Sequence, residues 1–262
     1  RLTTPLIREN GQFRPASWEE ALQRVADGLR AVARQHGGNA IGFIGSSKAS
    51  NEEAYLTQKI ARLIFGTNNV DNSSRYCQNP ATEGLFRTVG YGGDAGTLRD
   101  LQQTDLIITV GSNLAENHPV FASHIKQSHK HRGQKLLVVD PRRHEMAERA
   151  DCYLRIRPGT DMVWASAMAR YMFDHGYADE AFLRTRVNQV AEYRASLAPF
   201  TLEMASEVTG LSVAQLTEAA EMIGNAGSAC LLWAMGITQH SHGADTSTAL
   251  SNLLLVTGNY GR

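Results

Sequence analysis

Cysteine is scarce in this sequence, which holds only Cys77, Cys152 and Cys230 among its 262 residues. Their wide separation excludes a four-cysteine metal or iron–sulfur site built from this sequence alone. Few and scattered cysteines are also typical of a protein kept in a reducing compartment. We therefore expect a cytoplasmic protein.

An excess of charge of either sign is also missing. The 26 Lys and Arg residues balance the 26 Asp and Glu residues, so no broad field is available to hold a nucleic-acid backbone or an anionic membrane. Apolar runs are short, and none approaches the roughly 20 residues that a helix needs to cross a bilayer. We expect neither nucleic acid nor a membrane as a partner.

No Gly-x-Gly-x-x-Gly motif opens a helix after an expected strand, which argues against direct binding of NAD. What the sequence does contain is an alternation of short apolar runs with helical spacing. The runs at 40–45, 106–111, 135–140 and 229–234 favour buried strands, and helical patterns lie between them. This order predicts an α/β fold with doubly wound, mostly parallel sheets and Rossmann-like βαβ units.

Two regions are expected. Residues 1–72 fit part of a first α/β domain, and residues 73–262 fit a Rossmann-like domain. Residues 67–99 are rich in Gly, Asn, Ser and Thr, so they form the most loop-like segment, and loops commonly carry function.

Several glycine and acidic residues directly follow expected strands of the second region. Gly111 would allow close approach of a phosphate, and Arg142 would neutralise it. Asp140 is placed to bind a ribose, and Asp161 could pair with the two parallel donors of a guanine. Each has a structural alternative: Asp140 is followed by proline as in a strand-exit turn, Asp161 could be an N-cap, and Gly111 could serve a βα turn.

Four blocks of residues occur in one order: GSNLAENHP at 111–119, VDPR at 139–142, PGTD at 158–161 and WAMGITQH at 233–240. With RYCQNPAT at 75–82, they resemble the molybdopterin oxidoreductases, and most closely the formate dehydrogenase alpha subunits. The resemblance implies that 73–262 binds a pterin guanine dinucleotide. It implies these cofactor-binding residues: Gly111, Ser112, Asn113, Glu116, His118, Asp140, Arg142, Gly159, Asp161, Met235, Gly236 and Gln239.

Cys77 is the expected metal ligand and, with Gln78, forms the expected catalytic pair. The resemblance implies that a Cys77 thiolate completes the sphere of molybdenum or tungsten in a bis-molybdopterin guanine dinucleotide cofactor, and thiolates suit such soft sites. A partly exposed free thiol is the alternative. Cys152 and Cys230 lie in or beside strand patterns and are expected to be structural.

Gln78 departs from the family, because formate dehydrogenases of this kind usually carry histidine at this position. Glutamine can form hydrogen bonds but does not titrate near neutral pH. Formate oxidation is therefore implied by the family and not by the catalytic residues. Two alternatives stay open: a related molybdoenzyme acting on another small oxyanion such as nitrate, and a metal-free scaffold subunit.

The enzymes that the sequence resembles are much longer, so we expect an internal fragment. Its missing N-terminal and C-terminal domains would hold 4Fe-4S clusters and complete the pterin site. Formate is the expected substrate, and an electron-transfer subunit is a candidate partner. The fragment alone is expected to lack turnover.

Histidines are the last candidates. His124, His129, His131 and His144 cluster in the sequence, but the first three favour a solvated basic helix face over a metal site. His240 and His242 follow the last strand and could line the cofactor cleft.

Overall fold

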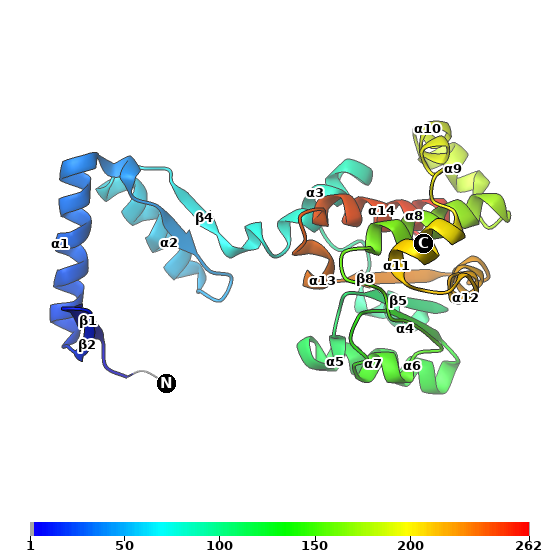
Figure 1. Cartoon of the computed structure of the whole chain (residues 1–262), viewed down its shortest axis with the longest axis horizontal. Helices are drawn as coiled ribbons and strands as arrows, with labels where there is room; N and C mark the ends of the chain where they lie inside the picture. Colours follow the sequence, from blue (N-terminus) through cyan, green and yellow to red (C-terminus); the bar gives the residue numbers. More distant parts are fainter. Residues whose placement is uncertain (1–2, 262) are drawn as a thin grey trace. The chain divides into compact units, whose positions relative to one another are not determined.

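The structure is a computed structural model that describes residues 3–261. The chain divides between Arg75 and Tyr76 into two compact units, called unit 1 and unit 2 here (Figure 1). This division falls three residues after the boundary expected from the sequence, at 72.

Unit 1 combines a hairpin, two helices and a small parallel sheet. Strands β1 and β2 pair antiparallel, and β3 pairs parallel with β4. The elements are β1 (Leu6–Glu9), β2 (Gln12–Pro15), α1 (Trp18–His36), the 3-10 turn η1 (Gly38–Ala40), β3 (Phe43–Gly45), α2 (Asn51–Lys59), the π-helical turn η2 (Ile60–Ile64), β4 (Val70–Asn72) and the 3-10 turn η3 (Ser73–Arg75).

Local capping explains where the helices of unit 1 begin. The Ser17 hydroxyl accepts a hydrogen bond from the backbone N–H of Glu20 and starts α1. Helix α2 begins with a capping box between Ser50 and Glu53, although Asn51, the next residue, is also of a type that favours the N-cap position. The expectation of a buried strand at 40–45 was wrong, because β3 has only β4 beside it and leaves Ile44 84% exposed.

Unit 2 is built on a four-stranded sheet with the order β7-β6-β5-β8, in which all neighbours are parallel. Val110 lies opposite both Val139 and Trp233, and Val139 lies opposite Leu154. The carboxyl ends of the strands therefore meet at one edge. The strands are β5 (Leu106–Val110), β6 (Lys135–Val139), β7 (Cys152–Leu154) and β8 (Ala229–Trp233).

Helices cover both faces of this sheet (Figure 1). Alternate strand residues point to opposite sides: Ile107 packs in one core cluster with α4, α6 and α7, and Ile108 packs in the other with α8, α12 and α14. The helices of unit 2 are α3 (Asn79–Thr88), α4 (Leu98–Gln103), α5 (Leu114–Asn117), α6 (Pro119–Arg132), α7 (Glu145–Arg149), α8 (Asp161–Asp174), α9 (Glu180–Arg186), α10 (Val190–Ser196), α11 (Leu202–Thr209), α12 (Val213–Gly224), α13 (Met235–Thr238) and α14 (Gly243–Val256).

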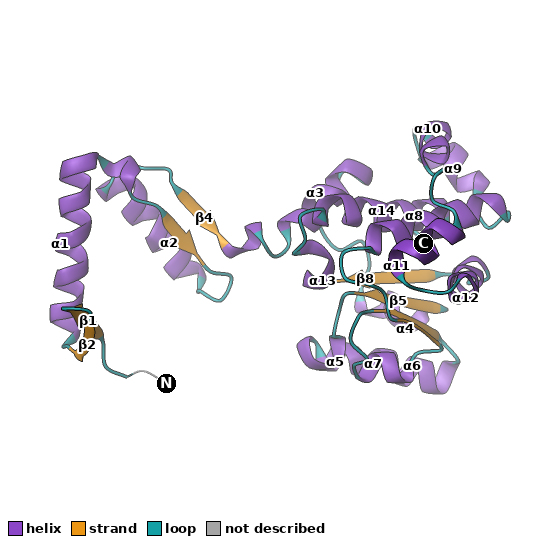
Figure 2. Cartoon of the chain, viewed as in Figure 1, coloured by secondary structure: helices purple, strands orange, loops and turns teal. Residues whose placement is uncertain are grey.

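The resulting three layers, with strands between helices in Figure 2, confirm the α/β prediction. The parallel β5, β6 and β7 are joined by crossover helices as in Rossmann-like units. Within residues 3–261, no helix is both long and apolar enough to span a bilayer.

Candidate cofactor site at the carboxyl edge of the sheet

The order of the strands creates a switch point between β5 and β8. The chain proceeds from β5 through β6 to β7 in one direction, and β8 then pairs on the other side of β5. Ligands of open α/β sheets bind outside the carboxyl ends of the strands at such a point, because the loops there diverge to opposite faces. A ligand site is therefore expected at this edge of the sheet.

Two glycines bring the loops after β5 and β8 into backbone contact. The N–H of Gly236 donates to the carbonyl oxygen of Gly111 across 3.1 Å. Gly111 has a φ of +56°, and a Cβ atom on it would lie 2.9 Å from the carbonyl carbon of Gly236. A side chain at Gly111 would therefore be strained and would also press the two loops apart.

Buried polar side chains without partners lie in the same two loops. Asn113 is 5% exposed, and neither its Oδ1 nor its Nδ2 has a hydrogen-bond partner. Thr238 is 2% exposed, and its Oγ1 is also unpartnered. Ser112 is buried beside Asn113. Because unpartnered buried polar atoms are rare, this pair fits a site that a polar ligand completes.

Two carboxylates from different loops also lie at this edge. Asp140 is buried directly after β6, and its Oδ1 accepts the backbone N–H of Arg142 at 2.8 Å. Asp161 is buried at the start of α8. Burial raises the pKa of Asp161 to about 6, the Asp140 charge adds to this rise, and His240 opposes it. Residues from the loops after β6, β7 and β8 thus lie close enough together to influence the pKa of one carboxyl group.

The other residues expected near the cofactor are more exposed. Gly159 has a φ of +81°, and a Cβ on it would lie 3.9 Å from Nδ1 of His240, so the loops after β7 and β8 approach each other here. Gln239 Nε2 donates to the sulfur of Met235, which is 47% exposed. Three further predicted residues have exposed side chains: Glu116, His118 and Arg142. Of these, Arg142 contacts the buried group through its backbone N–H.

Cys77 lies half-buried in the turn before α3, and Gln78 is exposed at the N-cap position of that helix. Helices α3 and α14 run side by side in the same direction, since Gly84 lies against Ala244 and Thr88 Oγ1 is 2.8 Å from Ser251 Oγ. Helix α3 also contacts α13. The segment that carries Cys77 is thereby held near the loop that follows β8.

His144 is a residue whose position the sequence did not reveal. The sequence placed it in a cluster with three helix histidines but predicted no environment for it; its side chain is 5% exposed, and its Nε2 lies 3.6 Å from Oδ2 of Asp140. The solvated-face interpretation was incomplete for two of the others, because the ring of His124 contacts Gln102 and that of His129 contacts the Gln134 carbonyl. The available signal was the four-residue spacing between Asp140 and His144.

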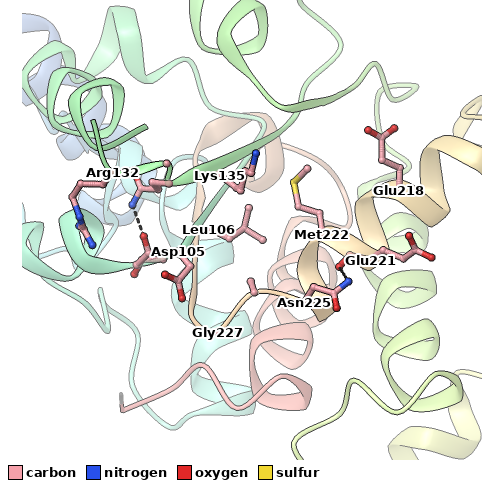
Figure 3. Close-up of a pocket in the computed structure, with 13 residues that line it drawn as sticks. Asp105, Leu106, Arg132, Lys135, Glu218, Glu221, Met222, Asn225 and Gly227 are labelled. Atoms are coloured by element: carbon pink, nitrogen blue, oxygen red, sulfur yellow. Dashed lines mark hydrogen bonds between the residues drawn. The ribbon is translucent and has the colours of Figure 1, made fainter. Parts of the chain in front are cut away.

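Figure 3 shows a separate pocket of unit 2, with a volume of about 640 Å³. Its lining includes Leu106 and Lys135, the first residues of β5 and β6, together with Glu218, Met222 and Asn225 of the α12 region. It is therefore at the amino edge of the sheet. Gln134 in its lining also has a buried oxygen without a partner, but the carboxyl edge gathers several such atoms, from Asn113 and Thr238, together with two buried carboxylates. The carboxyl edge is therefore the stronger candidate for a cofactor site.

The fold and these loops define a doubly wound α/β protein with a candidate ligand site at its strand tips. Residues 1–262 match the family model described as molybdopterin oxidoreductase, and the chain belongs to this family. Membership confirms the resemblance found in the sequence and implies a pterin cofactor that carries molybdenum or tungsten.

Individual relatives agree with this assignment. The chain is 58% identical to "Probable oxidoreductase YjgC" and 54% identical to "Putative formate dehydrogenase YrhE", both of Bacillus subtilis (strain 168). Each match covers 100% of this chain and 27% of the relative, so the chain spans about a quarter of the length of these proteins. This short coverage is consistent with a piece of a longer protein.

A solved structure supports the fold. Acetylene hydratase from Pelobacter acetylenicus superposes with a TM-score of 0.80 at 23% sequence identity, covering 100% of this chain and 36% of that one. The likeness confirms the α/β fold and its parallel sheets.

Proposed function

We propose that the chain is the central, pterin-nucleotide-binding part of a molybdenum- or tungsten-dependent oxidoreductase, and that the whole protein oxidises formate to carbon dioxide. The observation that carries the proposal is the gathering of Asn113, Asp140, Asp161 and the Gly111–Gly236 contact at one sheet edge. The names of relatives such as YrhE support formate as the substrate.

The described residues suit the parts of a guanine dinucleotide. The Asp161 carboxylate would accept the N1–H and 2-amino hydrogens of guanine, which are two parallel donors. Asp140 would accept ribose hydroxyls. The N–H groups that follow Gly111 would face a pyrophosphate, since close backbone approach is possible there.

Cys77 would supply the protein ligand of the metal. Among residues 3–261, no three His, Cys, Asp or Glu side chains gather closely enough to hold a metal ion. The resemblance to the family implies that the pterin would supply the other ligands of a metal beside Cys77, and a thiolate suits such a soft site. When bound, the metal centre would accept two electrons from the substrate and pass them on singly through iron–sulfur clusters held elsewhere in the whole protein.

Gln78 supports a second candidate function. It is exposed directly beside Cys77 and cannot exchange a proton near neutral pH, whereas formate oxidation releases one. Oxygen-atom transfer to or from a small oxyanion such as nitrate would place a smaller demand on this position.

These proposals are tested on the full-length protein purified from cells supplied with molybdate or tungstate. We expect bound metal, released guanine nucleotide, and dye reduction with formate that Cys77→Ser abolishes. Nitrate-dependent dye oxidation without formate activity would favour the second candidate. A protein free of metal and of pterin would overturn both and leave a scaffold role.

A further inference from the structure

His144 is the most unusual polar residue in unit 2 that the proposed function does not use. Its side chain is 5% exposed, and both ring nitrogens are buried without a hydrogen-bond partner. A buried polar ring normally costs stability unless its donors and acceptors are satisfied. The position therefore calls for a contact that is not formed among the described side chains.

Helix capping does not account for His144. The residue holds the N-cap position of α7, but its side chain makes no capping hydrogen bond. Ser, Thr, Asp or Asn would serve a cap better, so the histidine gives no local benefit to the helix. Its backbone is nevertheless well fixed, because its N–H donates to Arg142 and its carbonyl accepts from Glu148.

The nearest charged group to the ring is Asp140. Nε2 of His144 lies 3.6 Å from Oδ2 of Asp140, just beyond hydrogen-bond length, while Oδ1 is held by the N–H of Arg142 at 2.8 Å. Hydrogen bonds of ligand sites are often long before the ligand is present. A carboxylate offers about four acceptor positions, so two remain for a ligand after both of these contacts form.

We propose that His144 is a positioning residue for the sugar of the bound nucleotide. Its Nε2–H donates to Oδ2 of Asp140 and, with the Arg142 N–H on Oδ1, holds the carboxylate in one orientation. The free lone pairs of the two oxygens then accept the paired 2′- and 3′-hydroxyls of the ribose. This inference rests on the proposed nucleotide site and adds a residue that acts through Asp140.

Other groups near Asp140 do not replace His144 in this role. The Asp140 charge is felt by Tyr153 on the neighbouring strand, whose pKa is raised mainly by burial, and by Asp161. The phenol oxygen of Tyr153 is buried and unpartnered, but no contact with the carboxylate is formed. Asp161 is itself an acceptor when ionised. Only His144 presents a nitrogen within ion-pair distance of Oδ2 among the residues described.

The test compares two probes on the full-length protein freed of cofactor: GDP and 2′,3′-dideoxy-GDP, which lacks both ribose hydroxyls. Wild type is expected to prefer GDP by roughly ten-fold or more in Kd, the size expected for hydrogen bonds to a charged group. His144→Leu should lose most of this preference by weakening GDP alone. His144→Gln, whose amide N–H can take the place of Nε2–H, should retain it, and His144→Asn, which is too short, should not.

His124→Leu serves as the matched control, since it removes a half-buried histidine that is bonded to Gln102 instead of Asp140. If His144→Leu does not fold, the Gln and Asn variants decide. A preference for GDP that Asp140→Asn abolishes but His144→Leu and His144→Asn keep would overturn the His144 assignment alone. Equal binding of both probes by wild type, or no binding, would overturn the ribose site and with it this inference.

Discussion

Unit 1 and unit 2 differ in how much of their apolar side-chain surface is buried. Helix α1 has regularly spaced apolar residues but none that is buried, and Trp18 and Leu22 are 67% and 62% exposed. In unit 2, Trp164 and Met168 of α8 are fully buried against the sheet. Apolar helix residues thus belong to a formed core in unit 2, whereas in α1 they form an uncovered stripe that includes Trp18 and Leu22. We expect the stripe to be covered by parts of the longer protein that the relatives share.

The largest effect is expected from separating the units. Residues 76–262 produced alone should unfold in one cooperative thermal transition, since unit 2 buries its own core. Residues 1–75 alone should show no such transition, because few apolar side chains are removed from water there. Circular dichroism melting of both pieces measures this. Cooperative melting of 1–75 would show that the apolar stripe needs no cover.

Two tryptophans, one buried in unit 2 and one exposed in unit 1, allow a direct comparison of stability. Trp164→Ala should lower the free energy of unfolding by about 3–5 kcal/mol, because it leaves a cavity in the core. Trp18→Ala in the same 262-residue chain should change it by less than about 0.5 kcal/mol. Urea titrations give both values. In the full-length protein the Trp18 effect should grow, and its absence there would contradict the expected cover.

Acidic residues show the same contrast between the units. Glu9 and Glu20 of unit 1 are exposed, and hydrogen bonds from Arg14 lower the pKa of each. Asp161 of unit 2 is buried, and burial raises its pKa to about 6 from 3.8. Because the folded state then binds the proton more tightly, the stability contributed at Asp161 is greatest below pH 4 and is lost as the pH rises to 6.

Asp161→Asn should therefore stabilise the ligand-free chain at pH 7 by about 3 kcal/mol at most, and it should flatten the pH dependence between 4 and 6. Unfolding titrations at several pH values measure this change. Binding of GDP should show the opposite, falling below pH 6 in the wild type and falling strongly in the variant, since guanine pairs with the carboxylate. A variant that is destabilised at pH 7 would mean that Asp161 is already satisfied by the fold.

The smallest expected difference between the units is in the stability cost of replacing one glycine in each. Gly66 of unit 1 and Gly111 of unit 2 have similar positive φ angles, +63° and +56°, but only Gly111 has another backbone where a Cβ would lie. In the full-length protein, where we expect unit 1 to be covered, Gly66→Ala should cost about 1 kcal/mol from backbone strain, and Gly111→Ala should cost about 1–2 kcal/mol more. Equal losses in chemical denaturation would show that the contact with Gly236 relaxes freely.

The fold could be predicted from the sequence because it follows from local patterns of apolar residues. The apolar runs that form β5 and β6 are buried on both faces of a parallel sheet except at Lys135, as their composition predicts. The run that forms β8 lies at the sheet edge, where Ala229 and Leu231 are buried and the other three residues are half-buried. The prediction of a buried strand at 40–45 was wrong at Ile44 because an apolar run shows that a strand can be buried but not which element covers it. The four ordered blocks located the loops that gather at one edge, since the carboxyl ends of parallel strands share that edge.

The polar contacts and close approaches at the candidate site were harder to predict from the sequence. Burial of His144 beside Asp140 depends on how α7 packs on the sheet, and spacing in the sequence gives no measure of this. The approach of Gly111 to Gly236 joins segments more than a hundred residues apart. The roles of Cys77, Gln78 and the expected cofactor-binding residues stay predictions, because geometry alone shows where they lie.

X-ray absorption at the molybdenum or tungsten edge of the full-length protein shows whether Cys77 is a ligand of the metal. We expect a metal surrounded by sulfur, with one sulfur neighbour fewer in Cys77→Ser and no change in Cys152→Ser, whose sulfur is buried in unit 2. A sulfur shell that is identical in wild type and Cys77→Ser would contradict this assignment of Cys77.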